Sequence, residues 1–149
     1  MTALAFTVPG DIVPWQRASS RGGQRYTPLR QRMYQDTVRN HALRAVGMGK
    51  CSGIKWPLDA IYVLRIVIVR SGWQPFDADN AAKTVMDACR GVLWQDDRAR
   101  FVRAPWPVVA EPDAENPRTV VLVETADAER VEQVAREWLR EASEIQEAM

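Results

Sequence analysis

Cysteine and histidine are scarce in this chain. Its 149 residues include two cysteines, Cys51 and Cys89, and one histidine, His41. Two cysteines without CxxC spacing do not form a disulfide-rich scaffold, and free thiols in a reducing cytoplasm are the better interpretation. The usual zinc sites are excluded as well, because they require about four His and Cys ligands.

Long hydrophobic runs and glycine-rich phosphate loops are also missing. The longest apolar stretches, such as residues 66–69, are far shorter than the roughly 20 residues that cross a bilayer. Residues 1–6 have no basic start and no extended apolar core, so no signal peptide is expected. Without a phosphate loop, a nucleotide-sugar transferase is a weak interpretation. We therefore expect a cytoplasmic protein with no membrane partner and no organic cofactor.

The net charge of +1 conceals a strong charge asymmetry along the chain. Residues 1–56 carry nine Lys or Arg against two acids, whereas residues 111–149 carry four against eleven. A basic first third suits a surface that binds nucleic-acid phosphates, because Lys and Arg displace condensed counterions. The alternative is that these charges lie on solvated helix faces. The acidic last part is expected to lie away from a polyanionic substrate.

The hydrophobic pattern predicts one domain of mixed α/β architecture, of the α+β type, over residues 1–149. Strands are expected over residues 3–8, 58–69 and 118–124, with a proline-interrupted edge strand over 98–109. Helices are expected over residues 28–45, in the second half of the segment 77–91, and over about 126–147. Residues 11–26 are rich in Gly, Pro and Arg and predict a mobile basic loop. About three helices should pack on a mixed β-sheet.

The last predicted helix is amphipathic. An apolar stripe runs along it and is expected to face the domain; it comprises Val131, Val134, Ala135, Trp138 and Ile145. Trp138 is accordingly expected in the core. Trp15 and Trp73, by contrast, lie in predicted loops, where they can stack on nucleic-acid bases.

An acidic cluster is the most informative feature of the sequence. Five carboxylates and one lysine fall within 21 residues: Asp77, Asp79, Lys83, Asp87, Asp96 and Asp97. Carboxylate oxygens are the ligands that Mg²⁺ and Mn²⁺ prefer, usually alongside substrate phosphates. Crowded carboxylates repel one another unless a divalent cation lies between them. Such an ion polarises a phosphoryl oxygen and acidifies a bound water, so the cluster indicates metal-dependent phosphodiester cleavage.

Each of these residues also has a purely structural interpretation. Asp79 can cap the helix that follows, and Lys83 with Asp87 can form an ordinary surface pair at i,i+4 spacing. Asp96 and Asp97 can simply be turn residues. An EF-hand beginning at Asp77 would need Gly and Glu where Ala82 and Ala88 stand, so calcium sensing is excluded.

The order and spacing of the acidic residues resemble the signature of the RusA family of Holliday junction resolvases. The run Asp77-Ala78-Asp79-Asn80-Ala81-Ala82-Lys83 carries the resemblance, together with Asp87-Ala88, Gly91 and Asp96-Asp97. Weaker N-terminal matches are Val8-Pro9-Gly10, Val13-Pro14 with Arg17, and Tyr26-Thr27-Pro28 ahead of a helix with Tyr34. The resemblance covers roughly residues 4 to 125.

This resemblance implies a small homodimeric endonuclease that uses Mg²⁺, with Mn²⁺ as a substitute, to cut branched DNA, typically of phage or prophage origin. By position, Asp77, Asp79 and Asp97 would bind the metal and Lys83 would be the catalytic lysine. Asn80, Asp87 and Asp96 are secondary candidates. The DNA-binding candidates are Arg17, Arg21, Arg25, Arg30 and Arg90. Trp15-Gln16 and Arg98-Ala99-Arg100 depart from the family pattern, which affects DNA contacts and leaves the metal triad intact.

The sequence thus predicts a Mg²⁺-dependent, structure-selective endodeoxyribonuclease that resolves four-way junctions in DNA recombination and repair. The alternative is a non-catalytic DNA-binding or structural module, in which the acids only cap helices and pair with basic residues. A third possibility is a junction-binding relative without activity, but the complete set of Asp and Lys residues argues against it.

Overall fold

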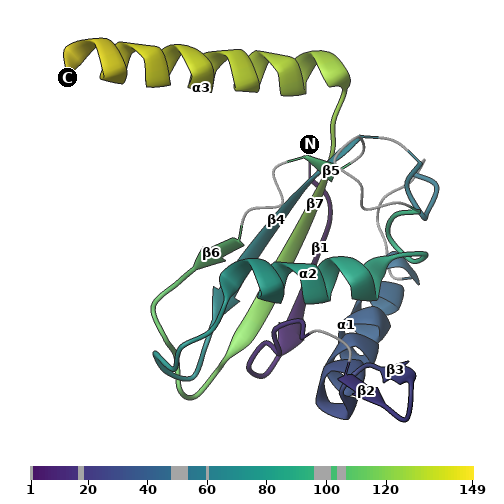
Figure 1. Cartoon of the computed structure of the whole chain (residues 1–149). Coiled ribbons are helices and arrows are strands. Elements are labelled where there is room, and N and C mark those ends of the chain that lie inside the picture. Colours follow the sequence, from purple (N-terminus) through teal and green to yellow (C-terminus); the bar gives the residue numbers. More distant parts are fainter. Residues whose placement is uncertain (1, 17–18, 48–53, 60, 96–101, 104–106) are drawn as a thin grey trace.

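A mixed β-sheet forms the centre of the protein. The structure is a computed structural model that describes residues 2–16, 19–47, 54–59, 61–95, 102–103 and 107–149. The strands of the sheet are β1 (Thr2–Pro9), β4 (Tyr62–Val69), β5 (Val102–Arg103), β6 (Pro107–Val109) and β7 (Arg118–Thr125). Their order is β1-β7-β4-β5, and β6 also pairs with β4 (Figure 1). β7 is antiparallel to β1 and β4, whereas β5 and β6 are parallel to β4, which confirms the predicted α+β class.

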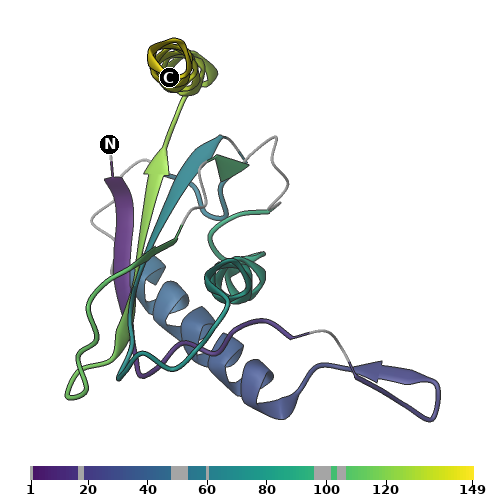
Figure 2. The ribbon, with the colours of Figure 1, turned by 60° about the vertical axis from the view of Figure 1, so that its left-hand side comes forward.

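Two helices cover one face of this sheet. α1 (Leu29–Gly47) and α2 (Ala78–Cys89) lie on the same side of the strands and contact each other (Figure 2). Along β1, the side chains of Leu4, Phe6 and Val8 are buried and alternate with exposed neighbours. This period of two is what a strand needs when only one of its faces is packed.

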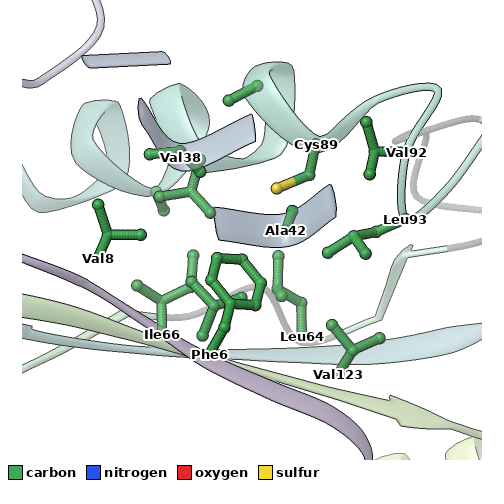
Figure 3. Packing of buried hydrophobic residues seen from close by; sticks show 14 of the residues in the cluster. Phe6, Val8, Val38, Ala42, Leu64, Ile66, Cys89, Val92, Leu93 and Val123 are labelled. Carbon is green, nitrogen blue, oxygen red and sulfur yellow. The ribbon is translucent and has the colours of Figure 1, made fainter. Parts of the chain in front are cut away.

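The core lies between the sheet and the two helices. Phe6 and Ile66 point from the sheet toward Val38 of α1 and Cys89 of α2 (Figure 3). Cys89 is a buried free thiol, as the sequence predicts, and burial raises its pKa to about 12. Its thiol therefore stays neutral and acts as a small apolar group.

The strand predicted over residues 58–69 is shorter than expected. β4 begins at Tyr62, and Leu58 instead forms an isolated bridge with Trp94, in the turn that follows α2. Trp94 is fully buried and stacks on Tyr62 with 5.1 Å between ring centroids. Its indole N–H donates to the carbonyl oxygen of Met86 at 3.2 Å. These contacts fix the path of the chain as it leaves α2.

The segment predicted as an irregular loop over residues 11–26 contains a β-hairpin. β2 (Ser19–Arg21) and β3 (Gln24–Tyr26) pair antiparallel around Gly22 and Gly23. Both glycines have positive φ angles, 61° and 80°. A two-residue turn with two positive φ angles matches the twist of a hairpin and favours glycine, so these two glycines form a tight turn within the segment that was predicted to be irregular.

The C-terminal helix departs most from expectation. α3 (Ala128–Ala148) extends away from the sheet, and none of its residues is buried (Figure 1). The prediction that Trp138 belongs to the core is wrong, because this residue is 64% exposed. The amphipathic pattern identified the apolar stripe of this helix but did not specify which surface packs against it. Among the described helices, none is both long and apolar enough to cross a membrane.

Candidate active site

The loop between β4 and α2 is anchored by Asp11, which follows β1. The Ser71 N–H donates to Asp11 Oδ1 at 2.8 Å, and the Ser71 hydroxyl donates to Asp11 Oδ2 at 2.5 Å. Arg70 donates from Nη1 to the carbonyl oxygen of Gln74 at 2.9 Å, and its guanidinium carbon lies 4.4 Å from the Phe76 ring centroid. These contacts fix the backbone immediately before Asp77, so the first acid of the cluster has a defined position.

The Asp11 anchor should make stability depend on pH. The hydrogen bond from the Ser71 side chain lowers the pKa of Asp11 below its ordinary value of 3.8, with further lowering by Arg70. A carboxyl with a depressed pKa stabilises the fold above its unfolded-chain pKa, and this contribution is lost as the pH falls through the lower folded-state value. We expect Asp11→Asn to lose about 1 kcal/mol of unfolding free energy at pH 7, since the group is partly exposed.

Thermal unfolding at pH 7 and at pH 3 tests this expectation. The gap in melting temperature between the unaltered chain and Asp11→Asn should be widest at pH 7 and should narrow as the pH falls below about 3.8. Ser71→Ala provides the matched control, because it removes the hydroxyl donor but keeps the backbone N–H donor and the Asp11 carboxylate. A gap that stays constant across this pH range would contradict the assignment.

Asp77 and Asp79 lie together at the start of α2. Asp77 is the N-cap residue, but its side chain makes no capping hydrogen bond to the helix. Its Oδ2 accepts instead from the side-chain amide of Asn80 at 3.0 Å. The structural alternative for Asp79, helix capping, is therefore not realised, because Asp79 falls inside the first turn and is exposed. Both carboxylates remain available to solvent at a helix N-terminus.

The two carboxylates influence each other directly. A hydrogen bond between the side chains raises the pKa of Asp77, and it lowers the pKa of Asp79. Backbone N–H groups of Asn80 and Asp79 lower the pKa of Asp79 further. Two carboxyl groups that interact in this way form an oxygen-rich site that a hard cation can occupy.

Lys83 lies one helical turn beyond Asp79 and pairs with Asp87. Its ammonium nitrogen is 3.4 Å from the Asp87 carboxylate and 5.1 Å from the centroid of the Trp15 ring. The Lys83 side chain is 46% exposed, so a phosphate can still reach it. The i,i+4 pair expected under the structural interpretation is thus present, and it lies on the same helix as Asp79.

Trp15 connects the N-terminal segment to this site. Its backbone N–H donates to the carbonyl oxygen of Asn80 at 2.9 Å, and its ring lies beside Lys83. The next residue, Gln16, donates its backbone N–H to Oε1 of the buried Gln31 at 2.8 Å. Trp15 was predicted to stack on nucleic-acid bases, and its contact with Lys83 was not predicted. An aromatic residue in a loop gives no indication in the sequence of which charged side chain it will meet.

The third predicted metal ligand lies outside the described residues. This applies to Asp97 and equally to Asp96, so their distance from Asp77 and Asp79 stays a prediction. Within the part of the chain that the structure describes, no three His, Cys, Asp or Glu side chains form a group able to hold a metal ion. The structure brings together Asp77, Asp79 and their neighbour Asn80.

The predicted DNA-binding arginines are distributed over several elements. Arg30 is exposed on α1, and Arg90 is exposed at the C-terminal end of α2, where its carbonyl oxygen accepts from Arg39 Nη1 at 3.1 Å. Arg21 and Arg25 belong to the β2–β3 hairpin, but only their backbone is described. Arg17 lies outside the described residues. The role of these arginines in DNA binding stays a prediction.

A comparison with protein families matches residues 9–124 to the family described as endodeoxyribonuclease RusA. The match covers more than half of the chain and includes the acidic cluster, α1, α2 and the sheet, except for β1, of which only Pro9 is included, and the last residue of β7. It stops before α3. A comparison with curated proteins gave no match. Together with the carboxylate pair at the start of α2, the family match leads to one conclusion: this chain belongs to the RusA family of endodeoxyribonucleases.

Proposed function

We propose that this protein is a Mg²⁺-dependent, structure-selective endodeoxyribonuclease that resolves Holliday junctions and related branched DNA. It would act as a homodimer in DNA recombination and repair, and Mn²⁺ would substitute for Mg²⁺. Two copies would present two active sites, as symmetric cutting of a four-way junction requires. Its cellular setting would be a bacterial cytoplasm, with a phage or prophage as the source of the gene.

One observation carries this proposal: the exposed pair Asp77 and Asp79 at the start of α2. The pair fits a divalent cation, because two exposed carboxyl groups that interact with each other offer hard oxygen ligands at one place. Asp97 would complete the ligand set. When bound, the ion would polarise the scissile phosphate and supply an acidic water molecule. Asn80 would orient Asp77 through its amide hydrogen bond.

Lys83 and the arginines would act on the phosphates. Lys83 would donate from its ammonium group to the phosphate that is attacked and would stabilise the added negative charge. Asp87 would hold Lys83 in position, since the two side chains already pair at 3.4 Å. Arg17, Arg21, Arg25, Arg30 and Arg90 would contact the DNA backbone. Such contacts position a duplex without specifying its sequence, so recognition would depend on junction shape.

The Lys83–Asp87 pair also fits the competing function, a non-catalytic DNA-binding module. The two functions differ in their response to metal. A nuclease should nick a synthetic four-way junction when Mg²⁺ or Mn²⁺ is added and should stop when the ion is chelated. A binding module should retard the junction equally with and without the ion and leave both strands intact. Intact strands at saturating protein and metal would therefore refute the proposal.

A further inference from the structure

α3 presents an exposed apolar stripe with no cover in the described structure. Trp138 and Ile145 are 64% and 56% exposed, although residues of this kind are usually packed. The helix has 21 residues, which corresponds to a length of about 31 Å. Asp127 caps it by accepting from the backbone N–H of Arg130 at 2.7 Å. α3 is thus a well-formed helix whose apolar side requires a partner.

The stripe follows a heptad repeat in which small and large residues alternate. In heptad notation, position a falls on Ala128, Ala135, Ala142 and Met149, and position d falls on Val131, Trp138 and Ile145. Every a and d position is therefore apolar, as the seam of a coiled coil requires. Each alanine is followed three residues later by a larger side chain. Along the seam, the alanines therefore leave space and the d residues project.

We propose that α3 is a self-association surface that pairs antiparallel with α3 of a second copy of this chain. In an antiparallel pair, each a position packs opposite a d position, so every alanine would face a large side chain of the other helix. Trp138 would pack over Ala135 of the second copy, and Ala142 would face Val131. The large d side chains of each helix would then fill the space beside the alanines of the other helix along the whole seam, as close packing requires.

The residues beside the seam favour this register. With Trp138 opposite Ala135, Glu141 lies across from Val134 of the other copy, so no two carboxylates meet. If Trp138 instead faced Ala142, the two copies of Glu141 would oppose each other at the symmetry axis. Two like charges in that position repel each other, so they disfavour the register in which Trp138 faces Ala142.

A parallel pair fits less well. It would place two Trp138 rings in one layer between layers that contain only alanines, which leaves uneven gaps along the seam. It would also set Asp127 of one helix against Glu132 of the other. The size alternation and the charges therefore both point to antiparallel pairing of two identical helices.

This inference deepens the proposed function, and its link to paired cutting of a junction rests on that function. The self-association itself does not, because it uses a helix outside the region matched to the family, residues 9–124. Oligomeric state can therefore be measured on the full chain without DNA or metal, whereas cleavage is measured separately. A dimer without nuclease activity would refute the proposed nuclease alone, and an active dimer that does not pair through α3 would refute this inference alone.

Sedimentation velocity of the full chain gives the first test. Trp138→Glu should weaken dimerisation at least about thirtyfold, since a buried tryptophan at the centre of an interface is a typical hot spot. Gln133→Glu is the matched control: it adds the same charge on the opposite face of α3 and should leave the dimer intact. The domain core is not affected, because Trp138 is exposed. An unaltered chain that is monomeric, or a Trp138→Glu dimer of normal strength, overturns the inference.

Cysteine cross-linking tests the orientation. A double variant, Val131→Cys with Ala142→Cys, should form a covalent dimer under oxidation, because these positions share a layer. Either single variant should not, since identical positions would lie about 16 Å apart along the antiparallel pair, too far for a disulfide. The unaltered chain controls for Cys51 and Cys89. A single variant that cross-links, or a double variant that does not, overturns the antiparallel pairing. A double variant that does not cross-link is also the result expected if α3 docks on the sheet of the second copy.

Discussion

Replacing Asp79 with asparagine is expected to reduce cleavage of a four-way DNA junction by at least about a hundredfold, while the junction still binds. Loss of groups that only orient a metal ligand already costs about 10–100-fold, and a direct ligand should cost more. Asparagine keeps the size of the side chain but removes the charge that would hold the cation. Binding should be equal or tighter, because one carboxylate less repels the phosphates. Single-turnover cleavage and gel retardation measure the two effects.

Asp36→Asn is a suitable control for this experiment. Asp36 is an exposed acid on α1, so the substitution removes the same charge from a helix surface outside the acidic cluster. Its cleavage rate should stay within about twofold of the unaltered chain, as expected for a surface change. Undiminished cutting by Asp79→Asn, with normal metal dependence, would remove the carboxylate pair from the active site.

Lys83→Met is expected to have the second-largest effect, a fall of about a hundredfold or more in the cleavage rate with little change in stability. Loss of a single positioned donor that stabilises a developing negative charge typically costs about 10²–10³ in rate. The pair with Asp87 is exposed and spaced i,i+4, so its removal should cost only about 0.3–0.5 kcal/mol of unfolding free energy. Single-turnover rates and thermal unfolding report the two quantities separately.

Asp87→Asn separates a catalytic lysine from a structural one. It breaks the same ion pair but keeps the ammonium group beside Trp15. If Lys83 acts on the phosphate, Asp87→Asn should lose less activity than Lys83→Met, because it removes the positioning carboxylate but keeps the ammonium group. Equal losses in the two variants would mean that the ion pair itself matters and that the lysine has no separate role in the chemistry.

Local patterns predicted most of the secondary structure. The strand predicted over residues 3–8 and the helix predicted over 28–45 match β1 and α1 closely, and Gly91, with φ of 79°, lies just beyond the end of α2. These signals depend on near neighbours in the chain. The start of β4 was misjudged because Leu58 pairs with Trp94, a residue 36 positions away whose partner the local pattern does not specify.

For the candidate site, the sequence predicted which residues belong to it but not the contacts that orient them. The spacing of Asp79 and Lys83 placed them one turn apart on one helix, and the structure agrees, with Asp77 immediately before them as the N-cap residue. What the sequence could not supply was the set of contacts that orient them. Asp11 lies 60 residues from Ser71, and Trp15 lies 68 residues from Lys83, and the fold brings each pair together.

The sequence by itself determined the family signature, the helix that carries the acidic residues and the amphipathic stripe of α3, because each is a matter of residue types at short, regular spacing. Only the tertiary structure decided that Asp77 caps α2 without using its carboxylate, that Asp11 anchors the loop before it, and that Trp138 faces solvent. The physical reason is the range of the interactions. Helix periodicity and capping act within a few residues, whereas anchoring and burial depend on which distant surfaces meet.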